Sequence, residues 1–311
     1  MALAEAPGSQ GGTGGFVLRA RTLSPLGAVP PPALILFGIL SVQLGAGLAK
    51  HMFDRISPDA IVLMRLGTSA IVLGFLGRRA LRTVLRDHSR SDLAVAVGFG
   101  LTLALMNYSI YQSFSRIPLG VAVTIEFLGP LMVSIVASRR LRDVVWALLA
   151  FGGVVMLARG GELDLVGIGF AVLAGACWAG YILLSVATGK RFSGSTGLAV
   201  ASIVGTLAMA PIGVASGGSA LLSPELLLIG LGVGLLSSVI PYTLELEALR
   251  RMPARVFGIL MSLEPAVAAL IGVLLLGEIL SGRQWLAIGC VVVACVGATR
   301  GQKDPPEAPE A

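Results

Sequence analysis

The sequence has little charge, few aromatic residues and very little cysteine or histidine. Charged residues make up 13% of its 311 residues and hydrophobic residues 55%, whereas a soluble domain carries about a quarter charged residues. A chain with so few charges cannot cover a surface that faces water. These proportions exclude an ordinary soluble protein and predict one that is surrounded by lipid.

Cysteine and histidine are too few and too scattered for a disulfide framework or a metal site. Cys177, Cys290 and Cys295 all lie inside apolar stretches, and His51 and His88 fall in predicted loops. The spacing of the cysteines matches no zinc motif, and no buried pair of histidines is available as a ligand set. We therefore expect no metal and no cofactor.

Several catalytic and energy-coupling motifs are also absent from the sequence. Without a GxxxxGK[ST] phosphate loop, the chain cannot itself be an ATP-driven pump. It also has no HExxH motif, no GxSxG turn and no aspartate-rich pair for phosphate chemistry. We therefore expect a protein that is not an enzyme, and that draws its energy from an ion or substrate gradient.

Long apolar stretches are abundant. A membrane helix needs about 20 mostly apolar residues, which predicts an all-α polytopic membrane protein with ten transmembrane helices. Flexible cytoplasmic tails are expected at residues 1–30 and 301–311. The ten predicted spans are residues 31–50, 58–77, 93–113, 118–138, 144–159, 165–187, 195–216, 225–247, 255–276 and 284–300.

The distribution of Lys and Arg predicts how the chain is oriented. With the N-terminus inside the cell, 17 of these residues lie in cytoplasmic segments, 5 lie in outer segments, and Arg65 lies within a span. This asymmetry follows the positive-inside rule and favours ten spans with both termini in the cytoplasm. It also explains the net charge of +6 by contact with anionic lipid, without nucleic acid as a partner.

An internal repeat relates the two halves of the chain. Pro118 and Pro130 are twelve positions apart, as are Pro253 and Pro265, and an arginine precedes each pair. The offset between the pairs is 135 residues, so 31–160 and 165–300 are predicted to be copies of one five-helix unit. Because five is an odd number of spans, the second copy enters the membrane upside down, which makes an inverted repeat.

Ionisable residues inside the predicted spans mark candidate functional positions, because each costs about 2.5–3.5 kcal/mol at mid-membrane. Arg65 lies in the second span, Glu126 in the fourth and Glu264 in the ninth. Arg65 and Glu264 each have an alternative interpretation as one partner of a buried ion pair that only joins helices. Glu245 and Glu247 lie late in the eighth span, and the interpretation as interfacial residues is favoured for Glu247.

Polar and aromatic groups inside the spans complete the candidate site. An interfacial aromatic belt is the alternative for the aromatic residues, but a buried amide needs a hydrogen-bonding partner. We expect these groups to line a polar cavity in which Arg65 binds the carboxylate of a small zwitterion and Glu126 its ammonium group. Glu126 is also the predicted proton carrier, since desolvation disfavours its charged form. The predicted site residues are Arg65, Asn107, Tyr108, Glu126, Trp178, Tyr181, Tyr242 and Glu264.

These residues lie in stretches that resemble the drug/metabolite transporter superfamily, in its EamA-type branch, and within it the inner-membrane exporters of threonine and homoserine. The resemblance covers residues 33 to 299. It implies export of small amino acids by proton antiport, with a central cavity between two inverted repeats, lined by the third, fourth, eighth and ninth helices. The stretches are SVQLGAGLAK (41–50), RLGTSAIVL (65–73), MNYSIYQSFSRIPLGVAVTIEFLGPL (106–131), GACWAGYILLS (175–185), PYTLELEAL (241–249) and FGILMSLEPAVAAL (257–270).

Other functions stay open at this point. Relatives in the branch export other metabolites and drugs, so the substrate is less well determined than the fold. A polytopic membrane enzyme needs a catalytic cluster at one face, and a channel needs a continuous polar stripe through several spans; neither is visible. The oligomeric state does not follow from the sequence.

Overall fold

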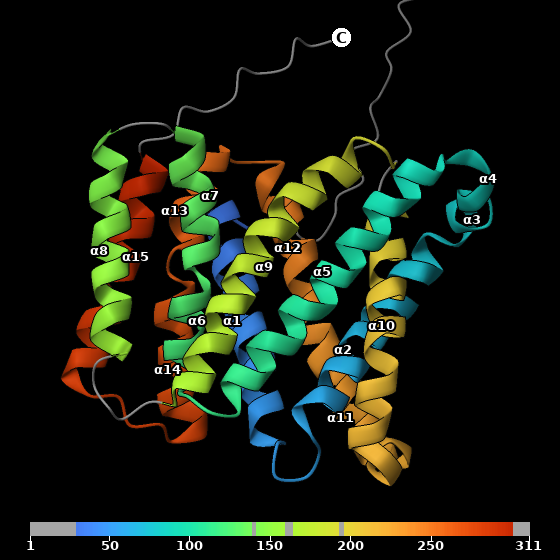
Figure 1. Ribbon diagram of the computed structural model, residues 1–311, viewed down its shortest axis with the longest axis horizontal. Helices are drawn as coiled ribbons and strands as arrows, with labels where there is room; N and C mark the ends of the chain where they lie inside the picture. Colours follow the sequence, from blue (N-terminus) through green and yellow to red (C-terminus); the bar gives the residue numbers. More distant parts are fainter. Residues whose placement is uncertain (1–28, 139–140, 159–163, 193–195, 301–311) are drawn as a thin grey trace, which may run out of the picture.

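A computed structural model describes residues 29–138, 141–158, 164–192 and 196–300, and in this part of the chain every regular element is a helix (Figure 1). The predicted tail at 301–311 lies outside the described residues, as does the tail at 1–30 apart from its last two. The elements are α1 (Pro31–His51), α2 (Pro58–Leu76), α3 (Arg78–Leu81), α4 (Val84–Asp87), α5 (Arg90–Phe114), α6 (Leu119–Glu126), α7 (Leu128–Ser138), α8 (Leu141–Ala158), α9 (Leu165–Gly189), α10 (Thr196–Gly217), η2 (Gly218–Leu222), α11 (Pro224–Gly234), η3 (Leu235–Val239), α12 (Ile240–Leu249), α13 (Ala254–Met261), α14 (Glu264–Leu276) and α15 (Gly282–Arg300).

The all-helical membrane fold class is confirmed. Within the described residues, nine helical stretches are long and apolar enough to cross a membrane, and Val144–Leu157 in α8 is a shorter apolar stretch. This shorter stretch coincides with the predicted fifth span, 144–159. The count of ten membrane-crossing helices stays a prediction.

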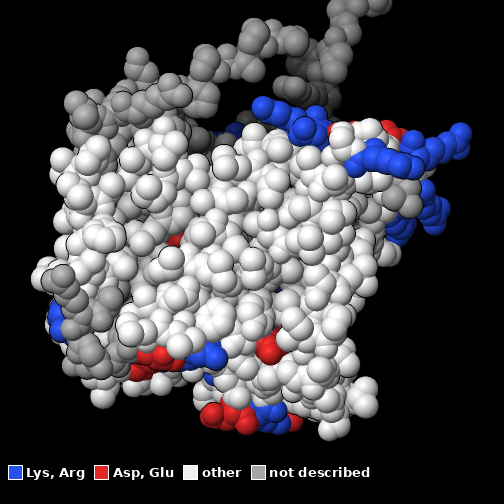
Figure 2. Space-filling view, in the orientation of Figure 1, with Lys and Arg blue, Asp and Glu red and all other residues white. Residues whose placement is uncertain are grey.

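The outer surface of the helix bundle matches a lipid environment. Large apolar side chains are exposed along many helices, including Ile71 (74% exposed), Leu148 (65%) and Leu274 (79%). Figure 2 shows a broad face that is almost free of charge between two edges where charged side chains gather, with Lys and Arg concentrated over α3 and α4. An apolar band of this kind between charged rims is expected of a polytopic membrane protein.

Local sequence signals define where several helices begin. The Ser89 side chain accepts a hydrogen bond from the Asp92 amide while Asp92 bonds back to Ser89, which is a capping box at the start of α5. Ser57 caps α2 just before Pro58, a residue that the first helical turn tolerates well. These caps satisfy backbone N–H groups that would otherwise lack partners.

Two of the predicted spans are broken helices rather than continuous ones. The span 118–138 divides at Phe127 into α6 and α7, and the span 255–276 divides after Met261 into α13 and α14. Both α6 and α13 are eight residues long, and they follow Pro118 and Pro253 directly. The two eight-residue helices therefore match under the same 135-residue offset that relates the prolines.

Helices from the two predicted repeats lie side by side throughout the bundle. In Figure 1, α5 runs beside α9, α10 packs on both α2 and α5, and α8 packs on α15. The backbones of α7 and α9 touch where Gly129 meets Gly175, since a Cβ at Gly129 would overlap the Gly175 carbonyl group. Small residues permit such close approach between membrane helices.

Ion pairs join the two predicted repeats at the end of the bundle where α1 ends and α6 begins. Lys50 Nζ lies 2.7 Å from Glu278 Oε1 and donates to the Ile117 carbonyl at 2.7 Å. Glu278 also accepts from the Leu119 amide with both oxygens, at 3.1 and 2.9 Å. Gly277 directs Glu278 back to this position by adopting a φ of +66°, which favours glycine.

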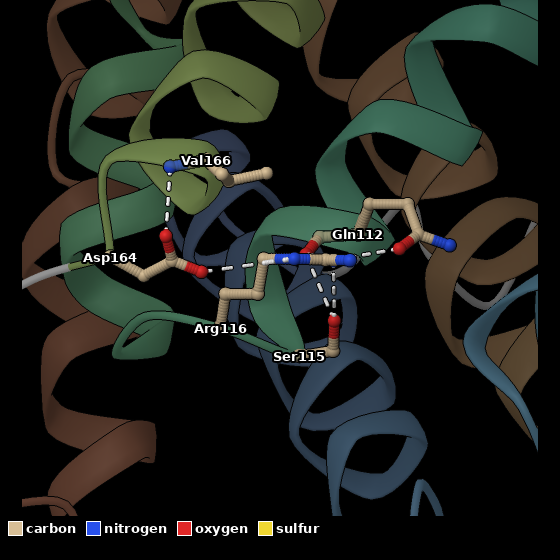
Figure 3. A network of polar contacts seen from close by, with 5 residues as sticks. All are labelled: Gln112, Ser115, Arg116, Asp164 and Val166. Atoms are coloured by element: carbon tan, nitrogen blue, oxygen red, sulfur yellow. Dashed lines mark hydrogen bonds and ion pairs between the residues drawn. The ribbon is translucent and has the colours of Figure 1, made fainter.

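A second network links the end of α5 to the start of α9 (Figure 3). The Arg116 guanidinium donates to the Gln112 carbonyl at 2.6 Å, to the Gln112 side chain at 2.7 Å and to the Ser115 hydroxyl at 3.0 Å. It lies 3.8 Å from Asp164, which also caps α9 by accepting from the Val166 amide at 2.8 Å. The Asp164 carboxylate therefore caps α9, in the second predicted repeat, and also pairs with Arg116 of the first.

Candidate functional site

A cavity of about 260 Å³ lies between the helices, and it brings together most of the predicted site residues. Seven of the eight predicted residues line this space, which we call the central cavity. Its walls come from α1, α2, α5, α6, α9, η3, α12, α13 and α14, a wider set than the four helices that the resemblance implies. The lining residues are Val42, Gln43, Ala46, Arg65, Met106, Asn107, Ile110, Phe114, Val123, Glu126, Trp178, Tyr181, Ser237, Tyr242, Glu245, Met261 and Glu264.

Arg65 is the cation of the central cavity, and backbone and aromatic groups hold it. Its Nη2 donates to the Ser237 carbonyl at 3.1 Å, and its Nη1 lies 3.5 Å from the Tyr111 hydroxyl. Within the described residues, no carboxylate lies within ion-pair distance of Arg65. The ion pair that the alternative interpretation of Arg65 requires is therefore not formed within this part of the chain.

The Ser237 carbonyl is accessible to Arg65 because the helix changes its winding there. Residues 235–239 form a π-helical segment, η3, between α11 and α12. Such segments are rare, and they frequently lie at functional sites. Gly45 of α1 packs directly against Ser237, where a Cβ would overlap the serine hydroxyl oxygen.

Carboxyl groups reach the central cavity from three helices. Glu126 is the last residue of α6, Glu264 is the first residue of α14, and Glu245 comes from α12. The first two therefore lie at the breaks of the two discontinuous helices. Glu247, by contrast, lies 3.7 Å from both Arg250 and Arg251, in agreement with its interpretation as an interfacial residue.

The buried amides find partners, but one keeps a free acceptor. Gln43 donates to Glu264 Oε1 at 2.9 Å across 221 residues of sequence, and Asn107 donates to the Leu103 carbonyl of its own helix at 2.8 Å. Within the described chain, the Gln43 Oε1 atom and the Ser237 hydroxyl are buried without a hydrogen-bond partner. Both residues line the central cavity, where a ligand would supply the missing partner.

The aromatic residues divide between the cavity and its surroundings. Trp178, Tyr181 and Tyr242 line the central cavity. Tyr108 does not line it; its ring packs edge-on against Phe170, with centroids 6.0 Å apart. Asn107, one position before Tyr108, does line the cavity. The sequence pattern alone does not show which of two neighbouring residues faces the cavity.

Three residues that the sequence did not mark as site residues line the central cavity or contact Arg65. Tyr111 is fully buried and holds Arg65; its position three residues after Tyr108 was the available signal. Glu245 faces the cavity although it lies near the end of a span. Ser237 offered no signal, because its role depends on the π-helical winding of η3.

Comparisons with known proteins point to one family. Residues 165–300 match the model of the EamA-like transporter family. The chain is 39% identical over 274 residues to the threonine/homoserine exporter RhtA of Salmonella typhimurium strain LT2, which covers 86% of this chain and 91% of the relative. It is 38% identical over the same length to RhtA of Escherichia coli strain K12.

A solved crystal structure supports the fold at lower sequence identity. It superposes with a TM-score of 0.58 at 17% identity and covers 86% of this chain and 96% of that chain. The matched relatives are transporters, so the prediction that this chain is not an enzyme is confirmed.

Proposed function

The chain belongs to the EamA-like transporter family, and we propose that it exports small amino acids, threonine and homoserine among them, across the inner membrane. The observation that carries this proposal is the central cavity. It combines one guanidinium with several carboxyl groups in a chain that is 39% identical to threonine/homoserine exporters. A zwitterion needs both kinds of group to replace the water that it loses.

Each end of the zwitterion has a partner in the central cavity. Arg65 binds the carboxylate, because a guanidinium presents paired N–H donors that match two carboxylate oxygens. Glu126 binds the ammonium group. The free Gln43 Oε1 and the unpaired Ser237 hydroxyl are suited to the hydroxyl that threonine and homoserine both carry.

The proposed transport cycle assumes ten spans in two inverted repeats, with both termini in the cytoplasm. The matching eight-residue helices α6 and α13 support the repeat. Discontinuous helices around a central site are typical of transporters in which two repeats rock against each other. In this proposal the end of the bundle that holds the Lys50 and Arg116 ion pairs faces outward, and export requires these pairs to separate.

Proton antiport supplies the energy in this proposal, with Glu126 as the carrier. A carboxyl group that exchanges a proton for the substrate ammonium couples the two movements at one site. Glu126→Gln then abolishes uptake driven by a pH gradient and retains substrate counterflow at a lower affinity, because the glutamine amide oxygen still accepts a hydrogen bond from the ammonium group. Unaltered gradient-driven uptake in this variant would remove Glu126 from the coupling.

The experiment that tests the function is uptake of radiolabelled threonine and homoserine into inverted vesicles or proteoliposomes, with and without an imposed pH gradient. We expect accumulation that depends on the gradient. Folded protein that accumulates neither amino acid would refute the amino-acid assignment, and a screen of other small metabolites would follow.

A further inference from the structure

A second cavity of about 210 Å³, which we call the side cavity, lies next to the central cavity. Trp178 and Met261 line both cavities, so these two side chains form the wall between them. The side cavity is lined by Phe127, Pro130, Leu131, Ser134, Trp178, Ile182, Phe257, Gly258, Met261, Ser262, Cys295 and Thr299.

The side cavity differs chemically from the central one. Among the described residues that line it, none is charged. Its hydroxyl groups are partly used within their own helices: Ser262 donates to the Gly258 carbonyl at 2.8 Å, and Thr299 donates to the Cys295 carbonyl at 2.7 Å. The remaining surface is mostly apolar and suits a hydrocarbon group rather than an amino or carboxyl group.

Trp178 and Met261 are the only residues common to the two cavity linings among the described residues. The Trp178 ring packs edge-on against Phe127, with centroids 4.9 Å apart and planes at 89°, which holds the indole in place. Met261 is the last residue of α13, immediately before the helix break. Its unbranched side chain has three rotatable bonds and adapts to its neighbours, so Met261 is the adjustable part of the wall.

We propose that Met261 and Trp178 set the upper size limit of the transported side chain, and that a larger apolar side chain occupies the side cavity once this wall is shortened. The inference rests on the proposed function, in which the central cavity holds the amino and carboxyl groups. The ligands admitted are then amino acids with larger apolar side chains, such as leucine and phenylalanine.

Met261→Ala tests the proposal, because it opens the wall, and Met106→Ala is the matched control. Met106 lines the central cavity but not the side cavity, so its removal adds similar space on the wrong side. In proteoliposomes, Met261→Ala should raise the ratio of leucine uptake to threonine uptake about tenfold or more over the unaltered protein, the effect of a methylene or more of pocket space. Met106→Ala should show no such gain.

A filling substitution distinguishes the side cavity from general loosening. Ser134 lines the side cavity alone, so Ser134→Leu placed in the Met261→Ala protein should return leucine uptake to its original level. A single symmetric peak in size-exclusion chromatography in detergent reports folding in each variant, and Trp178→Phe shortens the same wall if Met261→Ala yields no folded protein.

Several results would overturn the inference while threonine uptake by the unaltered protein is intact. One is leucine uptake by the unaltered protein that already equals its threonine uptake. The others are no increase in leucine uptake in the Met261 and Trp178 variants, an equal increase in Met106→Ala, or an increase that Ser134→Leu does not reverse. Failure of the unaltered protein to take up threonine or homoserine would instead refute the proposed function, and the inference with it.

Discussion

Replacing Glu278 with glutamine should destabilise the protein more than any equivalent change at an exposed ion pair. The Glu278 side chain is 11% exposed and Lys50 is 20% exposed, so water screens this pair poorly. Glu278→Gln loses the ion pair and leaves one oxygen for the Leu119 amide, which both carboxylate oxygens now bind. A hydrogen bond to a charged group contributes about 1.5–3 kcal/mol, and we expect a loss of that size.

Thermal unfolding in detergent at a fixed scan rate measures this loss. At about 2–4 °C for each kcal/mol, the melting temperature of Glu278→Gln should fall by about 3–12 °C. Glu225→Gln is the matched control at the same end of the bundle. Its carboxylate accepts from Arg55 at 2.7 and 2.8 Å, but the two side chains are 61% and 47% exposed, and exposed pairs contribute little. Equal shifts in the two variants would refute the argument that burial makes the Lys50–Glu278 pair strong.

Three further predictions concern the cavity and the backbone. Arg65→Lys keeps the charge but loses the planar fork that donates to the Ser237 carbonyl, so the KM for threonine should rise about tenfold or more at an unchanged level of folded protein; loss of folded protein would favour a structural role. Gly129→Ala should cost about 1–3 kcal/mol, since its Cβ would meet the α9 backbone, whereas Gly152→Ala, with open space around it, should be neutral or slightly stabilising in the same melting assay. Gly277→Ala should cost about 1–2 kcal/mol because its φ is +66°; an unchanged melting temperature would show that the turn has relaxed.

The sequence predicted much of the candidate site because ionisable groups are rare and costly inside a membrane. Arg65, Glu126 and Glu264 stand out in apolar stretches, and lipid cannot solvate them, so they have to face a shared interior space. Seven of the eight predicted residues do line one cavity. Their roles in binding and proton transfer stay predictions until transport is measured.

The residues that the sequence did not identify are those whose position depends on packing. Tyr108 and Tyr111 are three residues apart, yet Tyr111 contacts Arg65 while Tyr108 packs against Phe170 outside the cavity. Glu245 and Glu247 are two residues apart, and one faces the cavity while the other pairs with arginines near the helix end. Small rotations of a helix decide such differences, and neighbouring helices set those rotations.

The sequence by itself determined that this is an all-helical membrane protein with charged groups in its interior, because composition and apolar length follow directly from the residues. The tertiary structure alone decided which groups meet. The π-helical carbonyl that holds Arg65, the Lys50–Glu278 pair and the wall formed by Met261 and Trp178 all join segments that are distant in sequence. Such contacts depend on how helices cross in three dimensions, and the one-dimensional pattern of apolar residues does not specify those crossings.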